Sequence, residues 1–267
     1  MAGAPSLSQR VPWATIAALL IAGASVVATL QTIDFPLGTL GDEWAKIDAV
    51  RTGNNRYYHP LFMIELTQVV NLFAGARDLQ PIVEVGRACA AFAGGLLVFA
   101  TFRLARLVLP DIPALAASAA TAMVPLVTVH ARIFKEDIFV APFLLLALAT
   151  LIELLREPAP WRAVLLGVFA GLAAGSKYIG LLFLPFALAA IWFVPGPGAE
   201  RRGQRMLTVA GIAGLVFFLI EIPALRHLTR LRNGVTSCLM SAKILMSPDC
   251  LPRSVAATIA PLVGSIR

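Results

Sequence analysis

The sequence predicts an all-α, polytopic membrane protein with about seven transmembrane helices and interfacial helices in its first outer loop. Three observations support this class: 58% of the 267 residues are hydrophobic, only 14% are charged, and the mean hydropathy is +0.81. Soluble domains typically carry about 25% charged residues, so the shortfall excludes a water-soluble protein. The net charge of +7 does not indicate nucleic-acid binding, because membrane proteins concentrate Lys and Arg in their cytoplasmic loops.

Long apolar runs define the predicted spans. Val11 to Ile33 contains 23 residues without a charge, and about 20 residues cross ~30 Å of hydrocarbon. This run is too long for the apolar part of a signal peptide, so we expect a retained anchor. The later spans are predicted at Glu84–Phe102, Ile112–Ala131, Ile138–Ile152, about Ala163–Ser176, the rest of that run to Ala199, and Met206 to about Leu225.

The run from Ala163 to Ala199 has Lys177 as its only charge before its end. As one helix these 37 residues would extend roughly 55 Å, nearly twice the thickness of the hydrocarbon core. We therefore expect two spans joined by a turn at GSKYIG (Gly175–Gly180), where glycines flank the charge.

The distribution of arginines predicts the orientation. Alternation of the spans brings seven loop arginines to the side of Arg10, namely Arg103, Arg106, Arg156, Arg162, Arg201, Arg202 and Arg205. The positive-inside rule makes this side cytoplasmic. The outer side then receives residues 34–83, the cluster RIFKED (Arg132–Asp137) and Lys177. Three arginines after the last span do not fit this rule: Arg226, Arg230 and Arg232.

The first outer loop, residues 34–83, is much longer than the usual connection of 4–6 residues and should have structure of its own. Trp44, Ile47 and Val50 recur at helical spacing. The apolar segment Pro60–Phe73 is too short and interrupted for a span, so we expect a helix lying in the membrane interface.

Three charged places thus converge on the outer side: Asp42-Glu43, the cluster Arg132–Asp137, and Lys177. Ionisable groups at membrane depth cost several kcal/mol unless they are paired or hydrated, so they are functional candidates. Each also has a purely structural interpretation. Asp42-Glu43 would be solvated loop charges, Glu136-Asp137 a helix cap, Lys177 an interfacial lysine, and His59-Pro60 a helix start.

The order of these features resembles the membrane glycosyltransferases of the GT-C fold, within the protein O-mannosyltransferase and aminoarabinose-transferase superfamily (dolichyl-phosphate-mannose-protein mannosyltransferase-like). The similar segments are Asp42-Glu43 followed by Tyr58–Leu61, Gly86-Arg87 with the span after it, HARIFKED (His130–Asp137), and GLAAGSKYIG (Gly171–Gly180). Together they cover roughly residues 11–193.

The resemblance implies transfer of a sugar from a polyprenyl-phosphate carrier to a hydroxyl or amine of a protein, lipid or glycan acceptor, with inversion. The implied catalytic residues are Asp42 or Glu43 as general base, and Asp137. The implied substrate-binding residues are His59, Arg132, Lys135, Glu136 and Lys177. The cofactor stays open, since some relatives need a divalent metal and others do not. The implied location is a bacterial inner membrane, with the active site facing outward.

Two other functions stay open: a transporter of small solutes or lipids, and an inactive remnant. GT-C enzymes usually continue beyond seven spans, so we expect a truncated or short member. It would have a transmembrane domain at residues 1–233 and an unassigned tail at 234–267. Cys238 and Cys250 of the tail would form a disulfide only in an oxidising compartment.

Overall fold

The computed structural model describes residues 12–37, 43–53, 60–194, 197 and 199–225. The chain divides into two units, Met1–Ile222 and Pro223–Arg267, and the contacts described below lie within the first. Arg226, Arg230, Arg232, both tail cysteines and the predicted tail 234–267 lie outside the described residues.

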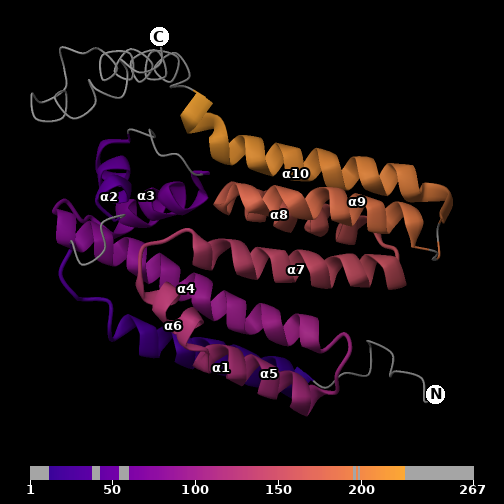
Figure 1. The fold of residues 1–267 in the computed structure, drawn as a ribbon, viewed down its shortest axis with the longest axis horizontal. Helices are drawn as coiled ribbons and strands as arrows, with labels where there is room; N and C mark the ends of the chain where they lie inside the picture. The colour runs from indigo at the N-terminus through magenta and orange to yellow at the C-terminus, as the bar shows by residue number, and fades with distance from the viewer. Residues whose placement is uncertain (1–11, 38–42, 54–59, 195–196, 198, 226–267) are drawn as a thin grey trace, which may run out of the picture. The chain divides into compact units, whose positions relative to one another are not determined.

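All regular structure in these residues is helical, which confirms the predicted class (Figure 1). The helices are α1 (Pro12–Leu30), α2 (Glu43–Thr52), α3 (Phe62–Ala74), α4 (Leu79–Ala105), α5 (Asp111–Met123), α6 (Pro125–Arg132), α7 (Asp137–Arg156), α8 (Pro160–Ser176), α9 (Phe183–Phe193) and α10 (Arg202–Leu225), with 3-10 turns η2 (Tyr178–Leu182) and η3 (Ala199–Arg201).

Each of the seven predicted spans contains a helix in the described residues, but seven crossings are not confirmed. Four helices of the described part, α1, α4, α7 and α10, are long and apolar enough to cross a membrane. The predicted third span is broken into α5 and α6, which meet at 57° and count as a fifth span only if taken together. Pro125 is the first residue of α6, and a proline cannot continue the hydrogen-bond ladder of a preceding helix. The helix α8 and the η2–α9 pair are apolar but shorter.

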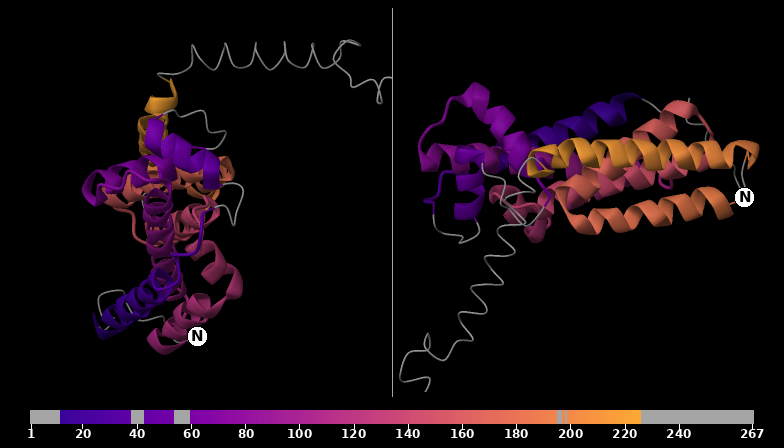
Figure 2. Two further views of the ribbon diagram at one scale, coloured as in Figure 1. Left: turned by 90° about the vertical axis from the view of Figure 1, so that its left-hand side faces the viewer. Right: turned by 90° about the horizontal axis from the view of Figure 1, so that it is seen from above.

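The helices of the first unit run back and forth between two ends (Figures 1 and 2). The connections between α4 and α5, α7 and α8, and α9 and α10 lie at one end, as the alternation of the arginines predicts. Ion pairs and hydrogen bonds hold these connections together. Arg103 pairs with Glu153 at 2.7 Å, and Arg156 donates to the carbonyl of Leu107 at 2.9 Å. The assignment of this end to the cytoplasm stays a prediction.

The first outer loop contains two helices, as expected from its length and pattern. The shorter of these, α2, is polar on average, whereas α3 is apolar and leaves Leu72 and Phe73 more than 80% exposed. Gly75 ends α3 in the left-handed conformation, with φ of 68°, which costs glycine little because it has no Cβ. The next helix, α4, begins at Leu79, five residues earlier than the predicted span.

A row of glycines joins α8 to α10. Gly167, Gly171 and Gly175 are four residues apart, and a Cβ placed on them would lie 2.5–2.7 Å from side-chain atoms of Ile212, Val216 and Ile220. Small residues at this spacing let membrane helices approach closely. The same helices share a buried core with α7 and α9, which contains Leu151, Leu154, Leu166, Ile191 and Val209. This packing fixes the end of α8, where Lys177 follows.

Candidate functional site

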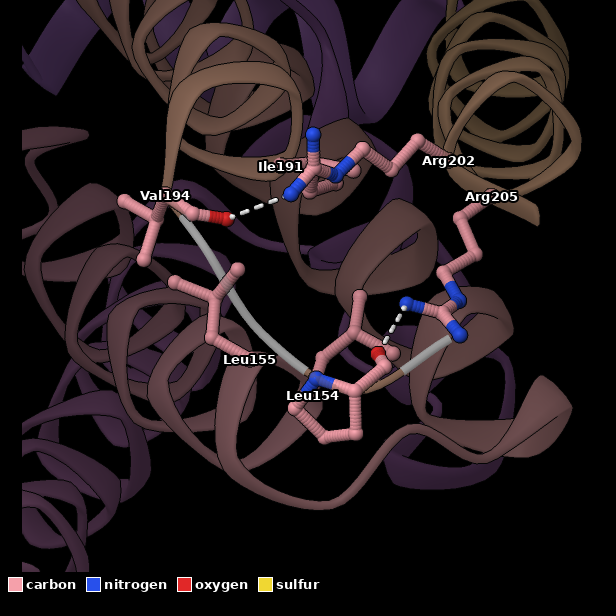
Figure 3. A pocket seen from close by; sticks show the side chains of 7 residues that line it. Leu154, Leu155, Ile191, Val194, Arg202 and Arg205 are labelled. Atoms are coloured by element: carbon pink, nitrogen blue, oxygen red, sulfur yellow. Dashed lines mark hydrogen bonds between the residues drawn. The ribbon is translucent and has the colours of Figure 1, made fainter. Parts of the chain in front are cut away.

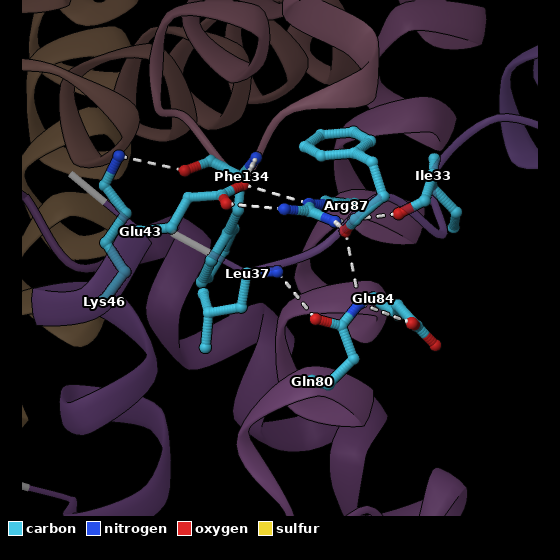
Figure 4. Close-up of polar contacts among 9 residues, drawn as sticks. Ile33, Leu37, Glu43, Lys46, Gln80, Glu84, Arg87 and Phe134 are labelled. Atoms are coloured by element: carbon cyan, nitrogen blue, oxygen red, sulfur yellow. Dashed lines mark hydrogen bonds and ion pairs between the residues drawn. The ribbon is translucent and has the colours of Figure 1, made fainter. Parts of the chain in front are cut away.

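Helix α4 is the platform on which the outer-loop helix α2 is held. Arg87 of α4 has no exposed surface, and its Nε and Nη2 donate to the two carboxylate oxygens of Glu43 at 3.0 and 2.6 Å (Figure 4). Its Nη1 donates to the carbonyl of Ile33, and its guanidinium lies 3.5 Å from the ring centroid of Phe35. This bidentate pair satisfies a charge that would be costly to bury alone.

The same carboxylate also holds the connection between α6 and α7. The backbone N–H of Phe134 donates to Glu43 at 3.1 Å, and the Phe134 carbonyl accepts from Lys46 at 2.9 Å. The Phe134 ring packs on Gly86, where a Cβ would lie 2.6–2.8 Å from ring carbons. Glycine at position 86 is therefore required for this close approach, and the motif Gly86-Arg87 carries both contacts.

A second buried ion pair lies beside the first. Lys46 of α2 and Glu136, the residue before α7, are 2.9 Å apart, and both side chains are buried. Glu136 makes no side-chain hydrogen bond that caps α7, and its carboxylate pairs with Lys46 instead. Two neutralised pairs thus lock α2 onto the α6–α7 connection.

Lys177 and Asp137 meet at the surface of this cluster. The ammonium of Lys177 forms a close ion pair with Asp137, and Lys135 lies 3.8 Å from the other oxygen of that carboxylate. All three side chains are about a third exposed. Asp137 is in the first turn of α7, where the helix dipole stabilises a carboxylate. Unlike the buried pairs, this group of two cations and one anion is accessible to a ligand.

The other predicted site residues do not take part in these ion pairs or lie outside the described residues. Arg132 is exposed at the last residue of α6. Asp42 and His59 lie outside the described residues, although Asp42 immediately precedes Glu43, and Pro60 follows His59. The structure therefore brings together Glu43, Lys135, Glu136, Asp137 and Lys177 from segments far apart in the sequence.

Arg87 and Lys46 were not predicted as site residues. Arg87 was quoted only as part of a motif, yet a charge inside an otherwise apolar run is a signal of an internal partner. Lys46 lies in a polar helix, and nothing in its local sequence distinguishes it from a solvated lysine.

The loop between α1 and α2 is also fixed to α4. The side-chain amide of Gln80 accepts from the N–H of Leu37 at 2.8 Å and donates to the carbonyl of Phe35 at 3.2 Å and to Glu84 at 2.7 Å (Figure 4). This loop leads directly to Asp42.

The described residues contain no group of three or more His, Cys, Asp or Glu side chains arranged to hold a metal ion. The oxygens of Asp137 are engaged by two lysines, which does not fit a ligand of a divalent cation. Participation of a metal stays an open prediction.

A small pocket at the arginine-rich end is too small to bind a substrate. It is lined by Leu154, Leu155, Ile191 and Val194, with Arg202 and Arg205 donating to the carbonyls of Val194 and Pro197 (Figure 3). Its volume of about 10 Å³ admits one water molecule at most, so its arginines cap the turn before α10.

Comparison with known protein families shows to which family this chain belongs. The model of the dolichyl-phosphate-mannose-protein mannosyltransferase family matches residues 80–225, more than half of the chain. The chain belongs to this family. The match includes Arg87, the α6–α7 connection and Lys177, and it begins after the loop that carries Asp42. A search of curated protein sequences found no match.

Solved structures of mannosyltransferase and oligosaccharyltransferase enzymes share the fold. The protein O-mannosyltransferase Pmt1-Pmt2 complex of S. cerevisiae matches with a TM-score of 0.66 and 16% identity, over 78% of this chain and 33% of that chain. Two structures of the Archaeoglobus fulgidus oligosaccharyltransferase match with TM-scores of 0.60. The first, with Zn and sulfate, is 19% identical over 79% of this chain and 31% of that one.

The second, AglB with an inhibitory peptide and a dolichol-phosphate, is 14% identical over 95% of this chain and 36% of that one. These likenesses establish the GT-C fold of an integral membrane protein. The chain spans about a third of the length of these structures.

Proposed function

We propose that this mannosyltransferase-family protein transfers a sugar from a polyprenyl-phosphate carrier to an acceptor hydroxyl or amine on the outer membrane face. The observation that carries the proposal is the docking of α2 onto the α6–α7 connection by Glu43, Arg87 and Lys46. This docking fixes Glu43, the residue that follows Asp42 in the sequence, against the connection that ends at Asp137, and Asp137 forms the accessible pair with Lys177.

In the proposed reaction Asp42 is the general base. Its carboxylate takes the proton of the acceptor O–H or N–H as the acceptor atom attacks the anomeric carbon. The bond from that carbon to the phosphate oxygen breaks, and the polyprenyl phosphate leaves with the bonding electrons. A single displacement of this kind inverts the anomeric centre.

Glu43 is better suited to position the base than to act as one. Both of its oxygens accept hydrogen bonds from Arg87, and one also accepts from Phe134. With both oxygens engaged and the side chain buried, this carboxylate is not accessible to an acceptor group. We therefore assign the base to Asp42, and to Glu43 the role of fixing the first turn of α2.

Lys177 and Lys135 would bind the carrier phosphate, with Arg132 available at the end of α6. Preorganised cations stabilise negative charge that develops on a leaving group. Asp137 would hold the lysine ammonium groups in place, and no step of this mechanism passes through a metal. His59 and Glu136 stay predicted as substrate-binding residues, but the buried pair with Lys46 favours a structural role for Glu136.

The related structures support the kind of partner. The Pmt1-Pmt2 complex was solved with its sugar donor, and the archaeal enzyme with dolichol-phosphate and, in another structure, with a tethered acceptor peptide. A carrier lipid and a polypeptide acceptor are thus precedented on this fold, although protein, lipid and glycan acceptors all stay within the proposal. So does a bacterial inner membrane with the site facing outward.

The test uses the full chain in proteoliposomes with polyprenyl-phosphate-mannose as donor and a panel of peptide, lipid and glycan acceptors. Asp42→Asn should abolish sugar transfer while Asp48→Asn, an equal change of charge on the exposed face of α2, leaves it unchanged. Lys177→Gln should raise the KM for the donor. Transfer at the normal rate by Asp42→Asn would overturn the role of Asp42, and an absence of any donor-dependent transfer by the unaltered chain would overturn the function.

A further inference from the structure

Glu221 is a partly exposed carboxylate that the proposed mechanism does not use. It lies near the end of α10, in a helix that is long and apolar enough to cross a membrane. One of its oxygens accepts the backbone N–H of Leu61 at 3.1 Å, and the other has no hydrogen-bond or ion-pair partner within the described residues. An ionisable group in a membrane helix is costly unless it is paired or hydrated, so Glu221 is a functional candidate.

The packing of α8 on α10 places Glu221 at the level of Lys177. In each contact of the glycine row, the glycine and the residue that it touches are separated by the same number of positions in the sequence. The two helices are therefore parallel, with a constant register. The last contact joins Gly175 to Ile220. One residue further along each helix, Glu221 is at the level of Ser176, which precedes Lys177.

The turn after α8 and the start of α3 border the same place. Tyr178, which follows Lys177, is 49% exposed and near enough to Glu221 to interact with it electrostatically. Phe62 at the start of α3 packs edge-on against Phe139 in the first turn of α7, with ring centroids 6.2 Å apart. Glu221 and Tyr178 thus lie next to the cation that we propose to bind the carrier phosphate.

A groove of about 350 Å³ between α3 and α10 provides room for a ligand here. Its lining is mostly apolar, contains Glu65, and includes Phe62 and Ile220, which are the sequence neighbours of Leu61 and Glu221. Ligand pockets are typically about 300–1,000 Å³ and mostly apolar, with a few polar groups that fix the orientation of the ligand. The groove therefore opens beside the unengaged oxygen of Glu221 with the size of a ligand pocket.

We infer that Glu221 and Tyr178 form the subsite for the sugar of the donor. The carboxylate accepts hydrogen bonds from sugar hydroxyls, and such charge-assisted bonds are stronger than bonds to a neutral acceptor. The Tyr178 ring has an apolar face and a hydroxyl at its edge, which matches a sugar with C–H bonds on its faces and hydroxyls at its rim. The assignment rests on the proposed function, because it takes Lys177 as the phosphate-binding cation and the sugar is bonded directly to that phosphate.

The experiment measures lipid binding without an acceptor, using native mass spectrometry of the full chain in phosphatidylcholine nanodiscs. The probes are polyprenyl phosphates that carry mannose, glucose, N-acetylglucosamine or arabinose. The reference lipid is polyprenyl methyl phosphate, in which a methyl group replaces the sugar and the phosphate charge is unchanged. We expect the unaltered chain to bind the best of the four glycolipids about tenfold more tightly than the reference, as hydrogen bonds to a charged group allow.

The variants test which residues produce this preference. Charge-assisted hydrogen bonds are roughly twice as strong as neutral ones, so Glu221→Gln should reduce the preference from about tenfold to about threefold. Its affinity for the reference lipid should stay unchanged. Tyr178→Leu should also reduce the preference, whereas Tyr178→Phe, which keeps the ring, should restore most of it. Glu200→Gln, the same substitution at an exposed position before the other end of α10, should have no effect.

A purely structural role of Glu221, as the anchor of Leu61, predicts a different result. Glu221→Gln would then weaken the glycolipids and the reference lipid alike and leave the preference unchanged. That result, or equal binding of all five lipids by the unaltered chain, would overturn the inference.

Transfer assays separate this failure from a failure of the proposed function. Asp42-dependent sugar transfer, together with an unchanged preference in Glu221→Gln, refutes only the sugar subsite. A sugar preference that depends on Glu221, without any donor-dependent transfer by the unaltered chain, refutes only the transfer function.

Discussion

Removal of one charge from the buried Glu43–Arg87 pair should be among the most destabilising changes available in this chain. In Glu43→Gln the shape is kept, but the guanidinium of Arg87, which has no exposed surface, loses its counter-charge. Breaking a buried ion pair by removing one partner costs about 3–5 kcal/mol. Arg87 still donates to the carbonyls of Ile33 and Phe35, so we expect a value near ~3 kcal/mol, the lower end of that range.

The loss should be local as well as global, because the pair joins α2 to α4. Hydrogen exchange of the α2 amides reports the free energy of local undocking, and thermal unfolding in detergent reports the whole fold. The double variant Glu43→Gln with Arg87→Met removes both charges. It should be less destabilised than the sum of the two single variants, with a coupling energy of at least ~2 kcal/mol.

The matched control is the pair of Arg162 and Glu157 at the other end. Its charged groups are 2.9 Å apart, and the Glu157 side chain is 57% exposed. Exposed ion pairs contribute about 0–1 kcal/mol, so Glu157→Gln should have little effect. If Glu43→Gln costs no more than this control, or if the single effects of the buried pair simply add, the explanation of how α2 is held is wrong.

Three further results are expected. Gly86→Ala should cost about 1–3 kcal/mol of stability, as overpacking does, because its Cβ would lie 2.6 Å from the Phe134 ring. Gly211→Ala on the open face of α10 should instead be neutral or stabilising, and thermal unfolding of the two variants compares them. Gly180→Ala would place a Cβ 2.3 Å from the carbonyl oxygen of Ala173, so it should displace the turn that follows Lys177 and reduce donor binding in a pull-down with immobilised polyprenyl phosphate. Lys46→Met should leave the buried Glu136 without this partner and lower the free energy of unfolding by about 3–5 kcal/mol, whereas Lys177→Met, at an exposed pair, should lower it by no more than about 1 kcal/mol.

Hydropathy was sufficient to locate the helices but not to decide which of them cross. The end of α8 at Ser176 agrees with the predicted boundary, because glycines and a lysine interrupt the apolar run there. The break at Pro125 was visible in the sequence, yet the surrounding residues are so apolar that the run still predicts one straight span. The early start of α4 was missed for a related reason. In the sequence, the charge of Glu84 indicates the start of the span. In the structure Glu84 lies within α4, where it accepts a hydrogen bond from Gln80 one turn earlier.

The candidate site was predictable only in part. Topology alone brings Lys177 and the cluster Arg132–Asp137 to one end, and the ion pair of Lys177 with Asp137 agrees with that expectation. The pairing of Glu43 with Arg87 is different, since the two residues are 44 positions apart and no local pattern connects them. Their burial decides their role, and burial of a charge depends on which helices pack together.

The glycine row of α8 also limits where Lys177 can lie along α10. Because the glycines are four residues apart, α8 can seat against α10 only at steps of four residues, each about 6 Å along the axis. A smaller slide would drive side chains of α10 into the backbone of α8. The position of Lys177 along α10 is therefore restricted to discrete values, and at the one observed its ammonium meets Asp137 in the first turn of α7. The position of the proposed phosphate-binding cation would thus be set by how α8 packs on α10, and only secondarily by the flexible lysine side chain.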